Sequence, residues 1–373
     1  MRVAFYAPLK PPDHKVPSGD RRMARLLMAA LRAAGHEVVL ASRLRSWTDG
    51  GDPERQARIR DRGRRIAAAL VRRWRDGSGR PDAWFTYHLY HKAPDWLGPP
   101  VADALGIPYV VAEASHAAKR ALGPWAEGHA AALAAIRRAD AVLALSAVDA
   151  EGLAGVVAAP DRLVRLPPFL DVAPFAAAGR AEARAKWFDG EVGPWLVAVG
   201  MMREGDKLRS YRVLADALRR LADLPWRLAL AGDGPARTAV LDGFDPARVR
   251  HLGQLSQDDL PGLLAGSDLM VWPAINEAYG MALLEAQAAG LPVVAGASGG
   301  VPDIVRHGAT GLLTPAGDAA AFAEAVRALL GDAGRRRALG AEAARIAAAE
   351  HGFPAAAAGL DAVLRRVTGR VTR

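Results

Sequence analysis

The chain of 373 residues contains no cysteine. Disulfide bonds and thiolate metal sites are therefore excluded, and the composition is compatible with a reducing compartment. No apolar run approaches the roughly 18 residues that a membrane-spanning helix needs. The stretch before Pro8 is too short to be a signal peptide. We therefore expect a cytoplasmic protein that is soluble or, at most, peripherally bound to the inner face of a membrane.

Acidic residues are scarce relative to basic ones. The chain has 49 lysines and arginines against 40 aspartates and glutamates, which gives a formal net charge of +9 and a pI near 10.2. This balance favours anionic partners such as nucleotide diphosphates, phospholipid surfaces or nucleic acid, but it does not choose among them. Nucleic-acid recognition would require exposed aromatic residues among the basic ones, or a known binding module. The sequence has neither, so we expect no nucleic-acid partner.

Two common nucleotide-binding fingerprints are missing as well. The sequence contains neither a GxGxxG dinucleotide motif nor a Walker loop. Dehydrogenase and kinase activities therefore lose support.

Strand and helix patterns alternate along the chain. Residues 2–7 are typical of an apolar strand, an amphipathic helix follows, and residues 38–41 form a second apolar strand. This order predicts an α/β fold with parallel sheets and right-handed crossovers. The proline-rich segment 166–175 interrupts the alternation, which starts again at residues 195–200. The sequence therefore predicts two domains.

The segment 276–286 is the first candidate for a site. An apolar strand pattern ends at Pro273, and good helix formers follow Gly280. A helix that begins at this glycine directs unpaired N–H groups and the positive end of its dipole at an anion. Glu277 and Glu285 bracket this point. About 12 Å of helix would separate them, which is more than the ~5–10 Å between paired glycosidase carboxylates. This separation favours binding of the two glutamates to opposite ends of a long ligand. The alternative is an acid that satisfies the helix dipole and an ordinary surface glutamate.

The order Glu277-Ala-Tyr-Gly-(four residues)-Glu285 resembles the E-x7-E signature of family 4 retaining glycosyltransferases, the group 1 type with the GT-B fold. The resemblance implies two Rossmann-like parallel-sheet domains that face each other across a cleft, with a C-terminal helix crossing back to the first domain. We expect an acceptor-side domain over 1–170, a nucleotide-sugar-binding domain over 171–354 and the returning helix over 355–373. In that family the first glutamate lies by the transferred sugar and the second binds the donor ribose.

A loop after the strand 195–200 supplies two cations, Arg203 and Lys207, as a diphosphate leaving group requires. The resemblance implies that they clamp the pyrophosphate. Arg203 is one position closer to the lysine than is usual in the family, and Leu208 replaces a glycine. The other donor-binding residues that the resemblance implies are Gln254 and Leu255, which would hold the base, and Tyr279, Gly280 and Met281 beside the first glutamate.

The first half of the chain offers candidates where strands end, since ligands of open α/β sheets bind at that edge. Gly19 either replaces the glycine pair that the family has near the donor phosphates, or the segment merely begins a helix that Ser18 or Asp20 caps. His88 and His116 are both expected just past strand ends. The resemblance places His116 near the transferred sugar, as a catalytic residue with Glu277, and we assign His88 and His91 to the acceptor cleft. His88 and His91 alone do not make a metal site.

Residues 54–75 predict a basic amphipathic helix that contains nine arginines. Its basic face either binds an anionic membrane or an acidic acceptor, or is simply solvated.

Together, the residues and the resemblance predict transfer of a hexose-type sugar from a nucleotide-diphosphate sugar to an unidentified hydroxyl acceptor. The configuration of the anomeric carbon would be retained, without a metal or a cofactor. The acceptor would be a glycan or a lipid-linked molecule in polysaccharide biosynthesis. The alternatives are a GT-B epimerase, an inverting transferase, or a non-catalytic protein that binds nucleotide sugars.

Overall fold

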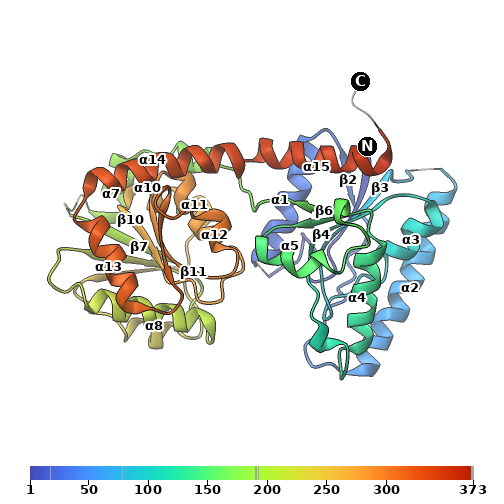
Figure 1. Cartoon of the computed structure of the whole chain (residues 1–373), viewed down its shortest axis with the longest axis horizontal. Helices are drawn as coiled ribbons and strands as arrows, with labels where there is room; N and C mark the ends of the chain where they lie inside the picture. The colour runs from blue at the N-terminus through green and yellow to red at the C-terminus, as the bar shows by residue number, and fades with distance from the viewer. Residues whose placement is uncertain (17, 78, 190, 192, 371–373) are drawn as a thin grey trace. The chain divides into compact units, whose positions relative to one another are not determined.

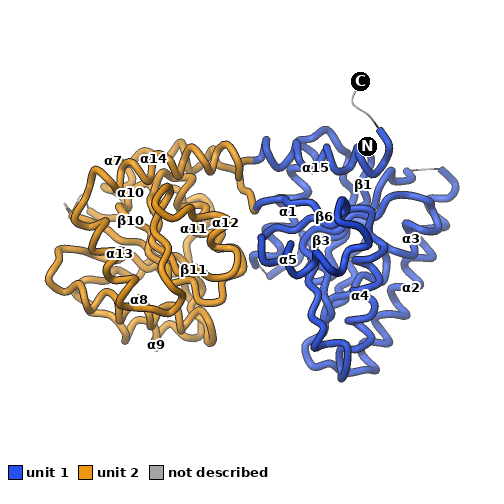
Figure 2. Tube along the Cα trace, in the orientation of Figure 1, with its two compact units in different colours: residues 1–167, 353–373 blue, residues 168–352 orange. Residues whose placement is uncertain are grey.

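The computed structural model describes residues 1–373 except 17, 78, 190, 192 and 371–373. The chain forms two compact units (Figure 2): unit 1 comprises residues 1–167 and 353–373, and unit 2 comprises 168–352. Strands and helices alternate in both units, and the strands of both sheets run parallel (Figure 1). The predicted α/β class is therefore confirmed. The last three residues of the predicted terminal segment, 371–373, lie outside the described residues.

Unit 1 is built on a parallel sheet with the strand order β2-β1-β3-β4-β5-β6. The inner strands are apolar and almost fully buried, as expected for a sheet that is covered on both faces. The strands are β1 (Arg2–Tyr6), β2 (Glu37–Leu40), β3 (Ala83–Leu89), β4 (Tyr109–Ala114), β5 (Ala141–Ala144) and β6 (Leu163–Arg165).

The helices of unit 1 follow the strands in sequence. They are α1 (Gly19–Ala33), α2 (Pro53–Arg75), α3 (Gly98–Leu105), the 3-10 turn η1 (Ala118–Arg120), α4 (Ala126–Arg138), α5 (Ala147–Ala154), the 3-10 turn η2 (Pro160–Arg162) and α15 (Phe353–Thr368). The predicted basic helix is present as α2, which begins with Asp52 as its capping residue.

The last helix, α15, packs against the first, α1, within unit 1. Leu360 and Leu364 of α15 are buried. His36, just after α1, places its Nε2 atom 3.2 Å from Oδ1 of Asp361. Arg366 donates a hydrogen bond of 2.5 Å to the carbonyl of Asp161. The end of the chain is therefore an integral part of the unit that contains its beginning.

Unit 2 carries a second parallel sheet with the order β12-β11-β10-β7-β8-β9. Its core combines apolar strands with large rings such as Trp195, Tyr211 and Phe322. The strands are β7 (Trp195–Val199), β8 (Arg227–Ala231), β9 (Val249–Gly253), β10 (Leu269–Trp272), β11 (Val293–Ala297) and β12 (Gly311–Pro315). The helices are α6 (Ala173–Ala176), α7 (Arg180–Phe188), α8 (Asp206–Arg219), α9 (Arg237–Leu241), α10 (Leu260–Gly266), α11 (Met281–Ala288), α12 (Val301–Ile304), α13 (Ala319–Leu330) and α14 (Ala333–Glu350).

Each sheet has a point where the direction of strand order reverses. In unit 1 this point lies between β1 and β3, and in unit 2 it lies between β7 and β10. The loops that leave neighbouring strands there diverge to opposite faces, which opens a crevice at the carboxyl edge. The candidate residues after β1, β3, β7 and β10 are therefore at the positions where this fold binds ligands.

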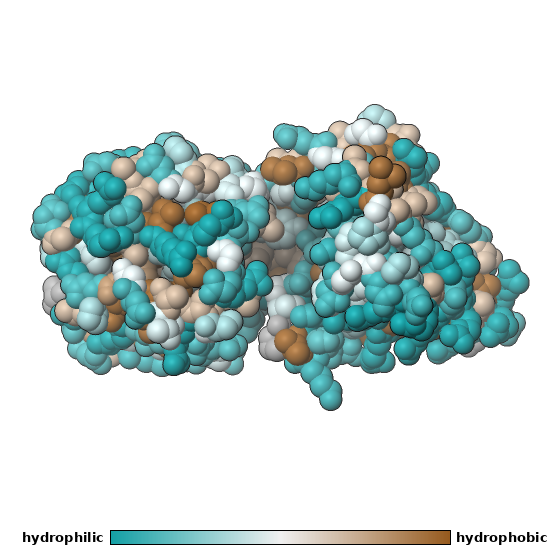
Figure 3. All heavy atoms as spheres, turned by 90° about the horizontal axis from the view of Figure 1, so that it is seen from below, coloured by the Kyte–Doolittle hydropathy of each residue, from teal (hydrophilic) through white to brown (hydrophobic). Residues whose placement is uncertain are grey.

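No helix in the described part of the chain is both long and apolar enough to cross a membrane. Most of the surface seen in Figure 3 is hydrophilic, and apolar side chains occur there in small, separate groups.

Candidate active site

Lys207 and Glu277 form the centre of the candidate site in unit 2. The Lys207 Nζ atom lies 2.5 Å from Oε2 of Glu277, and the indole Nε1–H of Trp272 donates a hydrogen bond of 3.0 Å to the same oxygen. Lys207 Nζ also lies 5.2 Å from the centre of the Trp272 ring. The side chains of Lys207 and Glu277 are only 18% and 16% exposed. Two donors therefore hold one carboxylate oxygen in a fixed place, largely shielded from water.

The sequence pattern had indicated a loop at Lys207, and this prediction is wrong. The helix α8 begins at Asp206, so Lys207 stands in its first turn. Gly205, with φ of 82°, makes the sharp turn into the helix. Arg203 precedes this turn and is exposed. The two predicted cations thus differ in rigidity, because Lys207 is held by a helix and an ion pair.

The loop 273–280 that carries Glu277 has a constrained backbone. Ala274 and Asn276 have φ of 53° and 50°, in the left-handed region. Each such residue costs about 1–3 kcal/mol and persists only where its surroundings impose it. The imposing contacts come from α8: Ser210 Oγ accepts from Ile275 N at 3.0 Å, and Asp206 accepts from the Asn276 amide at 2.8 Å. The α8 helix therefore positions both Lys207 and the loop that carries Glu277.

Gly280 begins α11 as predicted. Its φ is 76°, and α11 has no side-chain cap at this end. Backbone N–H groups at Met281 and beyond are thus available to an anion. Glu285 lies in the middle of α11 and is only 2% exposed, so the alternative of an ordinary surface glutamate is wrong for it. Tyr279 is half-buried at the end of the loop.

Gln254 and Leu255 follow the edge strand β9, which is two strands away from β7. Gln254 is exposed and Leu255 is half-buried against the core of unit 2. The structure thus places them at the same sheet edge as Lys207. It does not bring them into the Lys207–Glu277 cluster.

Two glycines let the loops of unit 2 approach one another closely. A Cβ atom at Gly232 would collide with the carbonyl oxygen of Gly200, and Gly232 has φ of 147°. A Cβ atom at Gly299 would collide with the carbonyl of Glu277 itself. Their contribution to the site had not been identified from the sequence, and neither had that of Trp272. A glycine directly after a strand, as at Gly232, is the signal that was available.

In unit 1, Gly19 opens α1, and Ser18 caps that helix by accepting from Arg21 N at 3.2 Å. A Cβ atom at Gly19 would meet nothing within 4 Å. The structure therefore gives Ser18 the capping role that the sequence allowed, and it shows no steric need for glycine at position 19.

His88 was expected just past a strand, and this position is wrong. It lies within β3, with φ of 61°. Its Nδ1 atom is 3.1 Å from Asp20 Oδ1 and 3.4 Å from Glu113 Oε1. Burial lowers the pKa of His88, but the carboxylates of Glu113 and Asp20 raise it more, so the pKa stands above its ordinary value. Burial likewise raises the pKa of Asp20, and the adjacent His88 outweighs it and holds that pKa low. The carboxylates of Asp20 and Glu113 therefore favour the protonated form of His88.

His91 and His116 have a different environment. Burial, with Arg120, Lys92 and His129, lowers the pKa of His91 to about 4. Burial, with His129 and Arg137, also lowers the pKa of His116, which follows β4. The His116 ring lies 5.1 Å from that of His129, measured between centres. His129 had not been identified from the sequence, and no sequence signal connects it to His116. The three predicted histidines thus fall into an acidic and a basic neighbourhood.

The described residues contain no group of three or more histidine, cysteine, aspartate or glutamate side chains that could hold a metal ion.

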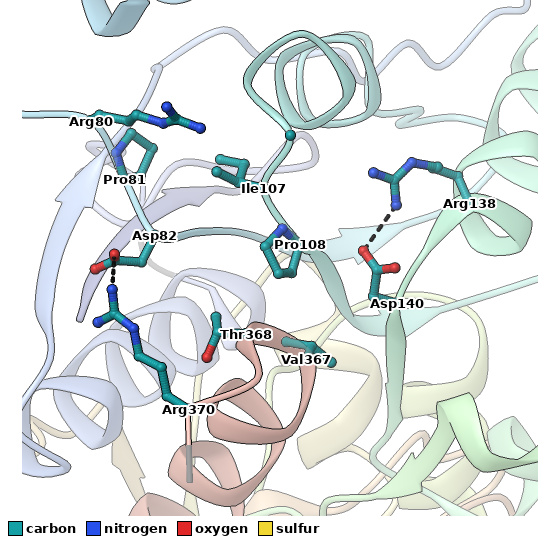
Figure 4. A pocket seen from close by; sticks show the side chains of 11 residues that line it. Arg80, Pro81, Asp82, Ile107, Pro108, Arg138, Asp140, Val367, Thr368 and Arg370 are labelled. Atoms are coloured by element: carbon teal, nitrogen blue, oxygen red, sulfur yellow. Dashed lines mark hydrogen bonds and ion pairs between the residues drawn. The ribbon is translucent and has the colours of Figure 1, made fainter. Parts of the chain in front are cut away.

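A cavity of about 570 Å³ opens at the opposite, amino edge of the unit 1 sheet (Figure 4). Four of its charged side chains are bonded in pairs: Arg370 donates to Asp82 at 2.7 Å and Arg138 to Asp140 at 2.9 Å. Arg80 donates to the carbonyl of Leu105. Asp82 and Asp140 directly precede β3 and β5. The cavity is therefore separate from the candidate residues, which lie beyond the carboxyl ends of the strands.

The chain is similar to known glycosyltransferases in sequence. The family model of glycosyl transferases group 1 matches residues 193–332. D-inositol 3-phosphate glycosyltransferase 1 of Catenulispora acidiphila is 31% identical over 292 residues, which are 72% of this chain and 69% of that protein. D-inositol 3-phosphate glycosyltransferase of Nocardia farcinica is 33% identical over 57% of this chain. That match spans 50% of the Nocardia protein's own length.

Solved structures show the same fold. Sucrose-phosphate synthase from Thermosynechococcus elongatus has a TM-score of 0.74 at 22% identity, and the match covers 100% of both chains. HepE of Anabaena in complex with UDP has a TM-score of 0.75 at 16% identity, over 98% of this chain and 100% of that one. These matches identify the fold as GT-B. Because the Catenulispora relative is matched over more than two thirds of its length, the chain belongs to the glycosyl transferases group 1, the family 4 type.

Proposed function

We propose that the protein transfers a hexose-type sugar from a nucleotide-diphosphate sugar to a hydroxyl acceptor, with retention of the anomeric configuration. The observation that carries this proposal is the Lys207–Glu277–Trp272 cluster at the switch point of unit 2. It combines a cation for a phosphate with an immobilised carboxylate for the sugar. The neighbour HepE, which was solved with UDP and with UDP-glucose, supports a donor of this class.

The proposed reaction breaks the bond between the anomeric carbon and the phosphate oxygen, and the bond's electron pair leaves with the nucleoside diphosphate. The acceptor oxygen forms its bond to the anomeric carbon on the same face, and its proton passes to the departing phosphate oxygen. Negative charge therefore grows on the diphosphate, where Lys207, Arg203 and the N–H groups at Gly280 and Met281 would stabilise it.

Glu277 would act on the sugar side of that bond. Positive charge develops at the anomeric carbon, and a carboxylate beside it lowers the barrier. In the structure, Lys207 neutralises this carboxylate. An arriving diphosphate would compete for the lysine, which would leave Glu277 more negative at the moment when the sugar needs it. We assign the ribose to Glu285 and the base to Gln254 and Leu255, as the family resemblance implies.

The test is a panel of UDP-, GDP- and ADP-sugars. We expect at least one donor to raise the melting temperature and to be hydrolysed slowly without an acceptor. NMR of the product with an acceptor then distinguishes a retained from an inverted or epimerised sugar. Binding without turnover on any acceptor favours a non-catalytic nucleotide-sugar-binding protein. The absence of binding by every donor contradicts both functions.

We also propose that the solvent face of α2 holds the protein on an anionic membrane, where a lipid-linked acceptor would reside. Arg62, Arg65 and Arg72 form a stripe at helical spacing, and each is exposed without an ion-pair partner among the described residues. A stripe of exposed arginines is suited to an anionic lipid surface.

Sedimentation with phosphatidylglycerol vesicles tests this contact. We expect the double variant Arg62→Gln, Arg65→Gln to lose most binding, because each basic residue near such a surface contributes about 1 kcal/mol. The matched control is Arg335→Gln, Arg337→Gln on α14, which removes the same charge from an exposed part of unit 2. Equal losses in both variants would mean that only net charge matters.

A further inference from the structure

The cavity at the amino edge of the unit 1 sheet is built from three neighbouring strands and the last helix (Figure 4). Its base is formed where β3, β4 and β5 begin, since Asp82, Pro108 and Asp140 directly precede these strands. Val367 of α15 and the nearby Arg370 line another side. The volume of about 570 Å³ is within the range of ~300–1,000 Å³ that is usual for small-molecule sites. The cavity is therefore large enough for an organic ligand.

The two aspartates of the cavity have structural partners. Asp82 Oδ2 accepts a hydrogen bond of 2.7 Å from the N–H of Arg2 in β1, and Asp140 Oδ2 accepts one of 2.8 Å from the N–H of Tyr109 in β4. Each carboxylate is also bonded to one of the arginines that line the cavity. The packing of the strand starts therefore explains both aspartates and the arginines that neutralise them.

Arg80 has no such role. It is exposed, donates to the carbonyl of Leu105, and has no ion-pair partner in the part of the chain that the structure describes. With three arginines and two aspartates, the lining of the cavity is thus positive by one charge. A positive concave surface attracts anions.

The position of a second arginine gives this charge a direction. Figure 4 shows the guanidinium groups of Arg80 and Arg138 on opposite sides of Ile107 and Pro108. Arg138 donates from Nε to Asp103 and from Nη1 to Asp140, and among the described residues nothing accepts from its Nη2. A guanidinium group has five N–H donors, so Arg80 also keeps donors beyond the one that it gives to Leu105. An apolar base thus lies between two cationic groups with N–H donors to offer.

We propose that this cavity is a second ligand site, which binds a small organic anion through a carboxylate or phosphate group held by Arg80 and Arg138. Guanidinium groups recognise both oxyanions through paired N–H donors. The apolar part of the ligand would rest on Ile107, Pro108 and Val367. The site is separate from the residues assigned to sugar transfer, so this inference does not depend on that function.

The ligand would fasten the end of α15 to the sheet. Unit 2 ends at residue 352, and α15 begins at Phe353, so this helix is the segment by which the chain returns to unit 1. A ligand that contacts both α15 and the starts of β3, β4 and β5 binds only the assembled unit. It would therefore stabilise the folded protein and slow the local opening of the helix end.

The first experiment follows the isoleucine δ1 methyl groups by NMR at low ionic strength, where charge contacts are least screened. The protein is titrated with citrate, with fructose 1,6-bisphosphate and, as the neutral control, with fructose. Ile107 reports on the cavity, and Ile275, in the loop that carries Glu277, reports on the candidate active site. We expect Ile107 to shift along a saturating curve with at least one of the two anions below about 10 mM, and not with fructose.

The anion that binds more tightly distinguishes a carboxylate from a phosphate ligand. If neither anion shifts Ile107, the proposal is wrong. A shift of Ile275 alone would place the anion in unit 2 and would equally overturn the proposal.

The variant Arg80→Gln tests the unpaired charge. It should weaken binding of the anion about tenfold, the effect of losing roughly one charge-assisted contact. The matched control is Arg75→Gln, an exposed arginine of α2 that does not line the cavity, and it should bind the anion as the wild type does. Melting temperatures without the anion check that both variants are folded. Equal weakening in both would mean that only net charge matters, which contradicts a site at Arg80.

Hydrogen exchange tests the link to α15. Saturation with citrate or fructose 1,6-bisphosphate, whichever shifts Ile107, should slow exchange of the amides of residues 360–368 about threefold or more. The amides of α8 in unit 2 should be unaffected, and Arg80→Gln should remove the protection at the same anion concentration. Equal protection in both helices, or none in α15, would contradict the fastening of α15 by the ligand.

Discussion

The two units share one plan and differ in how they use charge. Both have parallel sheets with a reversal of strand order, and both place their candidate residues after the strands that flank it. In unit 2, a lysine of α8 and an indole of β10 are bonded to a carboxylate on a constrained loop. In unit 1, histidines lie in acidic and basic neighbourhoods that shift their pKa values in opposite directions. The common topology thus fixes where chemistry is possible, while the side chains decide whether a site is rigid or titratable.

The largest effect is expected at the carboxylate of unit 2. Glu277→Ala should lower kcat by about 10²–10³-fold, because one preorganised electrostatic group is lost from the transition state. Donor affinity should change much less, since Lys207 would be released to bind the diphosphate. Steady-state kinetics and calorimetry with the donor measure the two quantities. Glu324→Ala, on the exposed face of α13, is the control. An unchanged kcat would remove Glu277 from the mechanism.

Backbone rigidity in unit 2 can be tested at Gly232. Gly232→Ala should destabilise the protein by about 3 kcal/mol, since it combines an unfavourable φ with a clash against Gly200. Gly152→Ala should do the opposite and stabilise α5 by about 0.5–1 kcal/mol, because the site is open and helical. Urea unfolding followed by tryptophan fluorescence measures both. If the Gly232→Ala protein were as stable as the wild type, the loops at Gly200 and Gly232 could move apart at little cost in free energy.

Lys207 should matter for donor binding as well as for catalysis. Lys207→Met removes a charge-assisted contact to the diphosphate, so the donor Kd should rise about 10–100-fold. Lys186→Met, which breaks a surface pair with Asp259, is the matched control and should leave the Kd unchanged. If Lys207→Met bound the donor as tightly as the wild type, the pair with Glu277 would be a purely structural contact.

The smallest effect concerns the pH dependence of stability in unit 1. A raised pKa means that His88 stabilises the fold fully below its ordinary pKa of about 6.5 and loses this contribution as pH rises through the folded value. His88→Gln should therefore cost about 1.5 kcal/mol near pH 6, and less at pH 9.

His91 provides the opposite case and the control. Its pKa of about 4 means that wild-type stability falls as pH drops from about 6.5 toward 4, because the unfolded chain takes up the proton first. The His91→Gln variant should thus become more stable relative to the wild type as pH falls over this range. Thermal unfolding across pH 4–9 compares both variants, and parallel curves would contradict the division into two neighbourhoods.

Much of the fold was predictable from the sequence, because parallel strands and amphipathic helices have clear periodicities. The basic helix and the helix after Gly280 were found in this way. The start of α8 was misplaced because residues 201–207 are mostly polar and lack periodicity. What places that start is Gly205 and the contacts of Asp206 and Ser210 with a loop some 70 residues later.

The candidate site was predictable where residues share one strand end and unpredictable where they meet only through tertiary packing. Glu277 and Lys207 follow strands that turned out to be neighbours, so their proximity was foreseeable. The position of Trp272 beside them was not, because an apolar strand does not reveal which of its rings turns toward a carboxylate. His129 belongs to a helix with no pattern of its own, and only the fold brings it to His116.

The packing of α15 against α1 has a consequence for biosynthesis. Unit 1 contains residues from both ends of the sequence, whereas unit 2 is a continuous segment between them. During translation, unit 2 can therefore complete its fold while unit 1 still lacks α15, and the face of α1 that α15 covers stays exposed until α15 leaves the ribosome. Unit 1 is thus completed after unit 2, and until then this face is a surface that chaperones can bind.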